Sequence, residues 1–380
     1  MKSIKEADVK NKTVLLRVDF NVPLKNGEVA DDSRIRASLP TIEYLRKKEA
    51  KIILISHLGR PDGKVTDELR LLPCAKRLEK LLKQQVLYQP DCIGSDVEEA
   101  ANTMHTADVL LLENLRFYPQ EEANDTSFAS KLANLADIYC NDAFGTAHRA
   151  HASVDAVTTF LPSYAGFLLE KEVRMLSKLA APKKPFIIIM GGAKVSDKIN
   201  VINKLMQKTD ALLIGGAMAF TFLKALGNET GKSKVELDKI NLARTLLKKY
   251  KKKIVLPVDI TLDNKKAVSV QHILKKSAGL DIGPLTSAIY AEIIKKAKTI
   301  FWNGPVGLFE KKPFDKGTKT IALAIASSKA LSIIGGGDTL AAIRQFKLEN
   351  KYTHASTGGG ASLEFLEGKK LPGIKALEKS

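Results

Sequence analysis

The chain has 380 residues, of which 44% are hydrophobic, and its 60 Lys and Arg against 42 Asp and Glu give a formal net charge of +18. This length exceeds the usual size of one hydrophobic core, so we expect two domains. No apolar run approaches the roughly 20 residues that span a bilayer, and the polar N-terminus lacks the apolar core of a signal peptide. We therefore expect a cytoplasmic protein with no membrane partner.

The cysteines bear on metal binding, and the net charge bears on the class of binding partner. Cys74, Cys92 and Cys140 are widely spaced and odd in number, which predicts reduced thiols and no zinc site. The positive charge favours anionic partners, which include phosphorylated metabolites and nucleic acid. The densest basic run, at 248–253, ends a predicted helix, where lysines complement the helix dipole. No zinc finger or aromatic RNA-binding pattern favours nucleic acid, which stays an alternative on charge alone.

Short apolar runs alternate with helix-like segments along the chain. The runs are TVLLRV, KIILIS, DVLLLE and DIYC in the first half, then FIIIMG, DALLIG, KIVLPV, TIFW and LSIIG. Such β-branched runs, apolar on both faces, are typical of buried parallel strands. Segments between them, such as 32–48 and 197–208, have the spacing of amphipathic helices. The alternation predicts an α/β protein with two doubly wound parallel-sheet, Rossmann-like domains.

One long helical segment separates the two series of strands. It is bounded by Pro162 and Pro182, and we predict an interdomain hinge helix at 166–182. Residues 1–165 would then form the N-terminal domain and residues 183–363 the C-terminal domain. A helix that tethers two such domains would let them close over two substrates.

Chemistry in open α/β sheets gathers beyond the carboxyl ends of the strands. In the first half, the polar residues after the strands are Asp19, Asn21, His57, Arg60, Arg116, His148, Arg149 and His151, and Arg34 and Arg36 open a helix. The planar guanidinium group suits phosphate and carboxylate, so this half predicts a site for a small polyanion. Arg36 is also typical of a surface ion pair. The flanking of Arg149 by two histidines favours a shaping role for them over metal binding.

Glycine turns follow the strands of the second half. They are MGGAK, IGGAM, WNGPVG, GGGDT and, near the end, STGGGAS. Backbone N–H groups in such turns can approach phosphate at a helix N-terminus. Lys194 and Lys198 have the spacing of one helical turn and would hold phosphate oxygens from one face. Asp338 would hold Mg²⁺ beside the phosphates, so this half predicts a nucleotide site.

A stretch at 225–234, ALGNETGKSK, contains the last three residues of a P-loop pattern, Gly231-Lys232-Ser233. However, Leu226 stands where the first glycine is required, and the preceding residues favour a helix where a P-loop needs a strand. We therefore place Lys232 in a solvent-exposed loop without a phosphate-binding role.

A basic half and a glycine-turn half together predict phosphoryl transfer between an anionic metabolite and a nucleotide, which depends on positioning and charge stabilisation. The chain carries no G-x-S-x-G elbow and no protein-kinase motif pair. A carboxylate acceptor is ionised at neutral pH and needs no general base. An oxidoreductase is disfavoured, because no G-x-G-x-x-G is followed by an acidic residue about 20 positions later.

Motifs at these strand ends resemble those of phosphoglycerate kinases. They are RVDFNVP, RIRASLPTI, SHLGRP, LLENLRF, NDAFGTAHRAHAS, GGAKVSDKI, GGAMAFTFLKALG, DIGP, FWNGPVG, GGGDT and STGGGASLEFLEG, in order over nearly the whole chain. The resemblance implies phosphoryl transfer from 1,3-bisphosphoglycerate to ADP, giving 3-phosphoglycerate and ATP with Mg²⁺. It also implies domain closure and a C-terminal segment, 364–380, that returns to the N-terminal domain. We expect a monomer.

The resemblance also implies roles for individual residues. In the N-terminal domain the glycerate ligand would be held by Asp19, Asn21, Arg34, His57, Arg60, Arg116 and Arg149. The nucleotide would be held by Lys198, Glu310, Gly336, Gly337, Asp338 and Thr339, with Glu310 towards the ribose and Asp338 at the metal. The migrating phosphoryl group would be stabilised by Arg34, Lys194 and the backbone amides near Gly337 and Gly360.

Two positions depart from the family pattern. Leu285 stands where lysine is usual, which affects packing more than chemistry. Lys234 stands where an apolar residue beside the adenosine pocket is usual, so nucleotide affinity or base preference would be altered. The segment 259–280 is shorter than is usual, and none of the phosphate-handling positions is lost.

Overall fold

The computed structural model describes residues 1–379, and the chain divides into two compact units. Unit 1 comprises Met1–Arg174 and the C-terminal residues from Lys370, and unit 2 comprises Met175–Lys369. The first division lies inside α6 (Phe167–Ser177), within the segment for which we predicted a hinge helix. The predicted return at 364 falls inside α13 (Gly360–Glu367), which belongs to unit 2. No helix among residues 1–379 is long and apolar enough to cross a membrane.

Unit 1 is built on a six-stranded parallel sheet in the order β5-β6-β4-β1-β7-β8. The strands are β1 (Thr13–Arg17), β4 (Lys51–Ile55), β5 (Leu87–Tyr88), β6 (Val109–Leu111), β7 (Ile138–Asn141) and β8 (Ser163–Ala165). The central strands are buried on both faces, as their β-branched runs predict. A short hairpin joins β2 (Leu24–Lys25) to β3 (Glu28–Val29).

Helices cover this sheet and bury an apolar stripe against it. They are α1 (Ser33–Lys47), α2 (Leu72–Leu82), α3 (Ser95–Thr103), α4 (Pro119–Glu122), α5 (Thr126–Ala133) and α14 (Pro372–Lys379), with 3-10 turns η1 (Ile4–Glu6), η2 (Asp67–Leu69), η3 (Leu115–Phe117), η4 (Phe144–Thr146) and η5 (Ala156–Thr159). On α1, Ile35, Ile42 and Leu45 are buried at helical spacing. They join Val14 and Leu16 of β1 in one core cluster.

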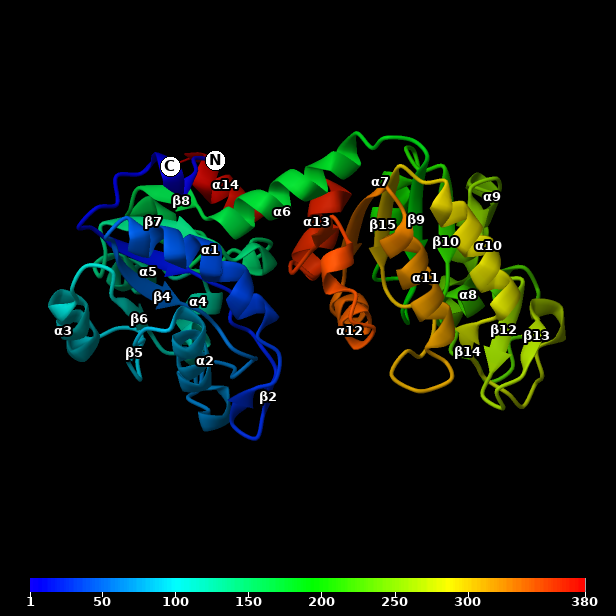
Figure 1. Cartoon of the computed structure of the whole chain (residues 1–380), viewed down its shortest axis with the longest axis horizontal. Coiled ribbons are helices and arrows are strands. Elements are labelled where there is room, and N and C mark those ends of the chain that lie inside the picture. Colours follow the sequence, from blue (N-terminus) through cyan, green and yellow to red (C-terminus); the bar gives the residue numbers. More distant parts are fainter. Residues whose placement is uncertain (380) are drawn as a thin grey trace. The chain divides into compact units, whose positions relative to one another are not determined.

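The C-terminal helix α14 lies beside β8 in unit 1, close to the N-terminus of the chain (Figure 1). The Gly373 N–H donates to the Ala147 carbonyl at 2.9 Å. A side chain at Gly373 would approach Val154 to 2.7 Å, so the glycine permits this close docking. Ala376 and Leu377 are buried.

Unit 2 contains a second six-stranded parallel sheet, in the order β11-β10-β9-β15-β16-β17. Its strands are β9 (Phe186–Met190), β10 (Ala211–Ile214), β11 (Ile254–Val255), β15 (Thr299–Asn303), β16 (Leu331–Gly335) and β17 (His354–Ala355). Numbered within the unit, this is the order 3-2-1-4-5-6 of dinucleotide-binding folds, which reverses direction between β9 and β15. The predicted doubly wound α/β class is confirmed.

The remaining elements of unit 2 lie around this sheet (Figure 1). They are η6 (Lys178–Ala180), α7 (Ile199–Leu205), α8 (Met218–Ala225), η7 (Leu237–Lys239), α9 (Ile240–Lys249), η8 (Val270–His272), α10 (Pro284–Lys295), α11 (Lys316–Ser327), α12 (Gly337–Gln345), η9 (Glu349–Lys351) and α13. Trp302 of β15 is fully buried in a core with Tyr290 and Ile321, from α10 and α11.

A small antiparallel sheet, in the order β13-β12-β14, lies within unit 2 and was not predicted. Its strands are β12 (Asp259–Leu262), β13 (Ala267–Ser269) and β14 (Gly279–Ile282). Ile260 and Leu262 pack with Phe220 of α8 in a separate apolar cluster. The short segment 259–280 therefore holds ordered strands that bring Ile260 next to α8.

Candidate functional site

The carboxyl ends of the unit 1 strands meet at one edge of the sheet, because all its strands are parallel. Asp19 follows β1, His57 follows β4, Arg116 lies in η3 after β6, and Arg149 follows β7. The edge thus gathers most of the residues that the sequence predicts for an anion. We call this group of residues, together with Asn21, Arg34 and Arg60, the basic edge.

Arg34 enters the basic edge from the first turn of α1. Its Nη1 lies 2.5 Å from Asp19 Oδ2, and Asp19 is buried. Asn21 Oδ1 accepts a hydrogen bond from the Gly59 N–H at 3.0 Å. A buried carboxylate therefore fixes the direction of the Arg34 guanidinium, and the loops after β1 and β4 are held together.

Arg116 is buried at the basic edge, and its Nη1 donates to the Gly59 carbonyl at 2.7 Å. Its Nε lies 3.0 Å from Glu122 Oε1 without the alignment of a hydrogen bond, and Arg149 Nη1 lies 3.9 Å from the same oxygen. Burial lowers the pKa of Arg116, and the Glu122 carboxylate opposes that shift. Glu122 was not predicted, because it lies on α4 and not directly after a strand.

The His57 imidazole is buried among cations. Burial lowers its pKa well below the ordinary value, and nearby guanidinium groups lower the pKa further, those of Arg17, Arg116, Arg34 and Arg149. The ring is therefore neutral at pH 7. Arg17, whose Nη2 lies 3.2 Å from His57 Nδ1, is fully buried and was missed, because it is inside β1 and not beyond its end.

Three further residues of the first half make none of the hydrogen bonds described above, although His151 Nδ1 lies 3.8 Å from Glu121 Oε1. Arg60 is exposed. Arg36 pairs with Asp32 at 2.9 Å, which confirms its interpretation as a surface ion pair. Burial lowers the pKa of His151 to about 3, so this ring is neutral as well. Within residues 1–379 no cluster of three or more His, Cys, Asp or Glu could hold a metal.

In unit 2 the sheet order reverses between β9 and β15, and the backbones beyond these two strands approach closely. A side chain at Gly191 would lie 2.0 Å from the Pro305 carbonyl oxygen, and one at Gly304 would lie 2.4 Å from that of Gly191. Only glycine fits there. Ligands of open α/β sheets bind at such a reversal point.

Lys198 lies at this reversal point. Its Nζ donates to the Asn303 carbonyl at 2.9 Å and to the Gly191 carbonyl. Burial lowers the pKa of Lys198 to about 8, against the opposing effects of Asp197 and Asp338. The ammonium is charged at pH 7 and held by carbonyls of both turns.

The prediction that Lys194 and Lys198 share one helical face is wrong. Helix α7 begins only at Ile199, and Lys194 lies in the turn before it. Glu236 holds this turn in a non-helical form, because its carboxylate accepts from the Ser196 hydroxyl at 2.6 Å and from the Val195 N–H. Both lysines still line the same cavity.

Two cavities, which share Gly192 and Ala193, lie at this end of unit 2. The smaller has a volume of about 280 Å³ and is lined by Gly192, Ala193, Lys194, Asp197, Lys198, Asn303, Gly304, Gly336, Gly337, Asp338, Thr339 and Leu363. The larger has a volume of about 390 Å³, and Phe220, Lys232, Lys234, Ile260, Leu280, Asp281, Pro305, Val306, Leu308 and Glu310 contribute side chains to it. We call them the polar and the apolar cavity.

The polar cavity contains the N-terminus of α12. Gly336 has φ +91°, and a side chain at Gly337 would meet nothing within 4 Å, so the first amides of the helix are open to a ligand. Asp338 is exposed in this turn. Thr339 is fully buried, and its Oγ1 accepts from the Gly304 N–H at 2.7 Å. Gly360 opens α13, whose Leu363 also lines the cavity.

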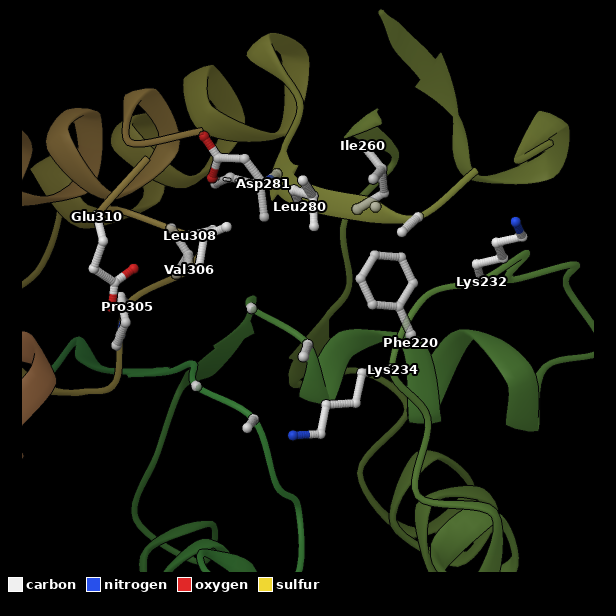
Figure 2. Close-up of a pocket in the computed structure, with 18 residues that line it drawn as sticks. Phe220, Lys232, Lys234, Ile260, Leu280, Asp281, Pro305, Val306, Leu308 and Glu310 are labelled. Atoms are coloured by element: carbon white, nitrogen blue, oxygen red, sulfur yellow. Dashed lines mark hydrogen bonds between the residues drawn. The ribbon is translucent and has the colours of Figure 1, made fainter. Parts of the chain in front are cut away.

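The apolar cavity suits a flat, weakly polar group. Figure 2 shows the Phe220 ring projecting from α8 towards Ile260 and Leu280, with Lys234 and Glu310 at the periphery of the cavity. Lys234 is exposed and does line the cavity. Leu285, the other departure, is 58% exposed on α10 and lines neither cavity.

Asp281, which sequence reasoning missed, lies at the wall of the apolar cavity. Its carboxylate accepts from the Gly317 N–H at 2.7 Å and from the Ile282 N–H at 2.9 Å. Burial raises the pKa of Asp281 to about 8, and Asp315 adds to the shift. The contact with Gly317 ties the cavity wall to the start of α11.

The Gly231-Lys232-Ser233 stretch forms a turn after α8, as predicted, and no strand precedes it. Gly231 has φ +55°, and Ser233 Oγ accepts from the Gly279 N–H at 2.9 Å. Lys232 is exposed but also lines the apolar cavity. The stretch therefore supports that cavity and not a phosphate loop.

Comparisons with known proteins agree with this geometry. The family model described as Phosphoglycerate kinase matches residues 4–369. Phosphoglycerate kinases from Dictyoglomus turgidum and Moorella thermoacetica are 55% and 52% identical to this chain, over 99% of it and 98% of each relative. The solved structure of phosphoglycerate kinase from Coxiella burnetii has a TM-score of 0.88 at 40% identity, covering 99% of this chain and 98% of its own. That from Pyrococcus horikoshii has a TM-score of 0.91 at 34% identity, covering 100% and 98%.

Proposed function

Because the chain belongs to the phosphoglycerate kinase family, we propose that the basic edge of unit 1 holds the glycerate ligand and that the two cavities of unit 2 hold the nucleotide. The enzyme transfers a phosphoryl group reversibly from 1,3-bisphosphoglycerate to ADP in glycolysis and gluconeogenesis, giving 3-phosphoglycerate and ATP. The observation that carries the assignment of the nucleotide is that a polar and an apolar cavity lie side by side, with Gly192 and Ala193 in the walls of both.

A nucleotide fits the two cavities in one direction. The polar cavity offers the ammonium of Lys198 and the open amides at Gly337, which suit phosphates. The apolar cavity offers Phe220 and Leu280 to a base, and the Glu310 carboxylate can accept hydrogen bonds from ribose hydroxyls. Thr339 supports the site by holding the Gly304 turn.

Mg²⁺ fits the polar cavity. Mg²⁺ is usually held by one or two carboxylates together with substrate phosphates and waters. Asp338 supplies one exposed carboxylate beside the phosphate region. The ion would neutralise phosphate charge there.

On the side of the glycerate ligand, Arg34, Arg116 and Arg149 supply guanidinium groups for its carboxylate and phosphate. Asp19 orients Arg34, Asn21 orders the neighbouring loop, and neutral His57 acts as a hydrogen-bonding group. Arg60 is free to turn towards a ligand, because it is exposed. Arg34, Lys194 and the amides at Gly337 and Gly360 would stabilise charge on the phosphoryl group in flight.

The transfer itself needs no general base from this chain. The attacking group, a carboxylate of 3-phosphoglycerate or a terminal phosphate of ADP, is already ionised at neutral pH. Positioning and charge stabilisation therefore supply most of the catalysis. We further infer a cytoplasmic monomer that closes about the helix at 166–182, which a fall in the radius of gyration on adding both ligands would test.

A coupled assay tests the proposed function. Purified protein with ATP, Mg²⁺ and 3-phosphoglycerate should form 1,3-bisphosphoglycerate, which glyceraldehyde-3-phosphate dehydrogenase then reduces with oxidation of NADH. Omission of 3-phosphoglycerate is the control for background oxidation of NADH. A folded protein that gives no turnover would reject the proposal.

A further inference from the structure

A chain of buried polar groups leads away from His57 into the interior of unit 1. Arg17 donates from Nη2 to His57 Nδ1 at 3.2 Å, from Nε to Ser153 Oγ at 2.8 Å, and from Nη1 to the Val18 carbonyl. Ser153 Oγ in turn donates to Glu121 Oε1 at 2.6 Å. Arg17, Ser153 and Glu121 are all fully buried.

Ser153 is held in place by further contacts. Its N–H donates to Glu121 Oε2 at 2.9 Å, and its carbonyl accepts from the Tyr139 hydroxyl at 2.6 Å. The hydroxyl group has one hydrogen, which it gives to Glu121, so its lone pair is available to the Arg17 Nε–H. The donor and the acceptor of each hydrogen bond from Glu121 to Arg17 are therefore fixed.

The contact with Arg17 determines where the proton of His57 lies. A guanidinium group has donors only and keeps its charge, so His57 Nδ1 must accept. Since the neutral ring carries one proton, this proton lies on Nε2. Every cationic group that faces the ring, those of Arg17, Arg34, Arg116 and Arg149, disfavours a second proton.

We propose that Glu121, Ser153 and Arg17 are positioning residues that hold His57 as the neutral Nε2–H tautomer, which presents an N–H donor to an anion at the basic edge. The use of that donor for the glycerate ligand rests on the proposed function. The Glu121 carboxylate compensates the buried Arg17 charge through Ser153, so that a cation can lie buried beside His57. Without these three residues, the imidazole could instead present the lone pair of Nε2 to the anion, and the lone pair and the anion repel each other.

The tautomer can be measured directly. In protein labelled with ¹⁵N-histidine, a His57→Gln variant assigns the His57 signals. We expect wild-type His57 to show the neutral Nε2–H pattern throughout pH 6–8 in the absence of ligand. A protonated ring or a dominant Nδ1–H tautomer would overturn the proposal. This measurement does not depend on turnover, so its failure is distinct from a failure of the proposed function.

Ser153→Ala removes the hydroxyl that links Arg17 to Glu121, and Ser163→Ala is its matched control. Ser163 is a buried serine of the same unit, and its hydroxyl donates to the Leu161 carbonyl. We expect Ser153→Ala to show a mixture of His57 tautomers and a KM for 3-phosphoglycerate raised about tenfold, with a smaller change in kcat, because one charge-assisted hydrogen bond is lost. Ser163→Ala should keep the wild-type tautomer and KM.

A second variant covers the case in which Ser153→Ala does not fold. Arg17→Lys keeps the charge but has one nitrogen, which cannot occupy the separate positions of Arg17 Nε, Nη1 and Nη2. We expect the same mixed tautomers in Arg17→Lys. If either folded variant keeps the wild-type His57 spectrum and KM, Arg17 and Ser153 do not position the ring, and the proposal is wrong.

Discussion

In the proposed function, the two units bind anions through different kinds of group. Unit 1 uses charged side chains, such as Arg34 and Arg116, each held by a carboxylate or a carbonyl. Unit 2 uses backbone at glycine turns, with the single buried ammonium of Lys198 at its centre. We therefore expect the site in unit 1 to be impaired when a side chain is removed, and the site in unit 2 to be impaired when a side chain is added.

Removal of a side chain from the basic edge should have the largest effect. We expect Arg34→Ala to lower kcat by roughly 10³-fold, since it removes a charge aimed at the phosphoryl group. The thermal unfolding temperature should fall only modestly, because Arg34 is partly exposed although its partner Asp19 is buried. Arg36→Ala, which removes a surface ion pair of the same helix, is the control. Near wild-type turnover of Arg34→Ala would remove this residue from the mechanism.

Addition of a side chain at the reversal point of unit 2 should have the second-largest effect. We expect Gly304→Ala to lower the free energy of unfolding by about 3 kcal/mol, because φ is +98° and the new Cβ would lie 2.4 Å from the Gly191 oxygen. Gly337→Ala, whose Cβ would meet nothing within 4 Å, should change the stability by less than about 1 kcal/mol. Urea unfolding monitored by circular dichroism measures both. Equal losses would contradict the role assigned to close backbone approach.

We expect the ammonium of Lys198 to make nucleotide binding depend on pH. Its pKa is lowered to about 8, so the free enzyme loses this charge as the pH rises through 8. We expect the affinity for ADP to fall up to about tenfold per pH unit above 8, until binding no longer needs the charge. Calorimetric titration from pH 7 to 9.5 tests this. Lys198→Arg, which stays charged, should give a flatter profile, and identical profiles would contradict the prediction.

The smallest effect should come from Lys234, at the edge of the apolar cavity. We expect Lys234→Leu to lower the KM for ADP a few-fold, because an apolar side chain would lie against the base. An ammonium donates to a base carbonyl, so the ratio of kcat/KM for GDP to that for ADP should fall in the variant. An unchanged ratio would show that Lys234 does not affect base choice.

The strands and glycine turns were predictable because each leaves a local signal. TVLLRV and FIIIMG became β1 and β9, and the turns after β9, β10, β15, β16 and β17 lie where expected. The antiparallel sheet β12–β14 was missed, since its strands are short and only partly buried. The separation of Lys194 from the helix depends on Glu236, which lies about 40 residues later in the chain and gives no local signal.

The site was predictable to the extent that its residues follow strands. Asp19, His57, Arg116 and Lys198 were predicted in this way, and their binding roles stay predictions. Arg17 and Glu121 were not, because a strand interior and a four-residue helix predict packing and not chemistry. Their importance depends on long-range pairing, Arg17 with Ser153 across 136 positions, which only the folded chain reveals.

The docking of α14 in unit 1 has a consequence for synthesis on the ribosome. Unit 2 is continuous from Met175 to Lys369, so its whole sequence is translated before the last residues of unit 1. Unit 1 lacks the contacts of Gly373, Ala376 and Leu377 until these residues are made, although its first strand is made at the start. Unit 1 therefore cannot complete its fold while the chain is still being made, although N-terminal domains generally fold first during synthesis.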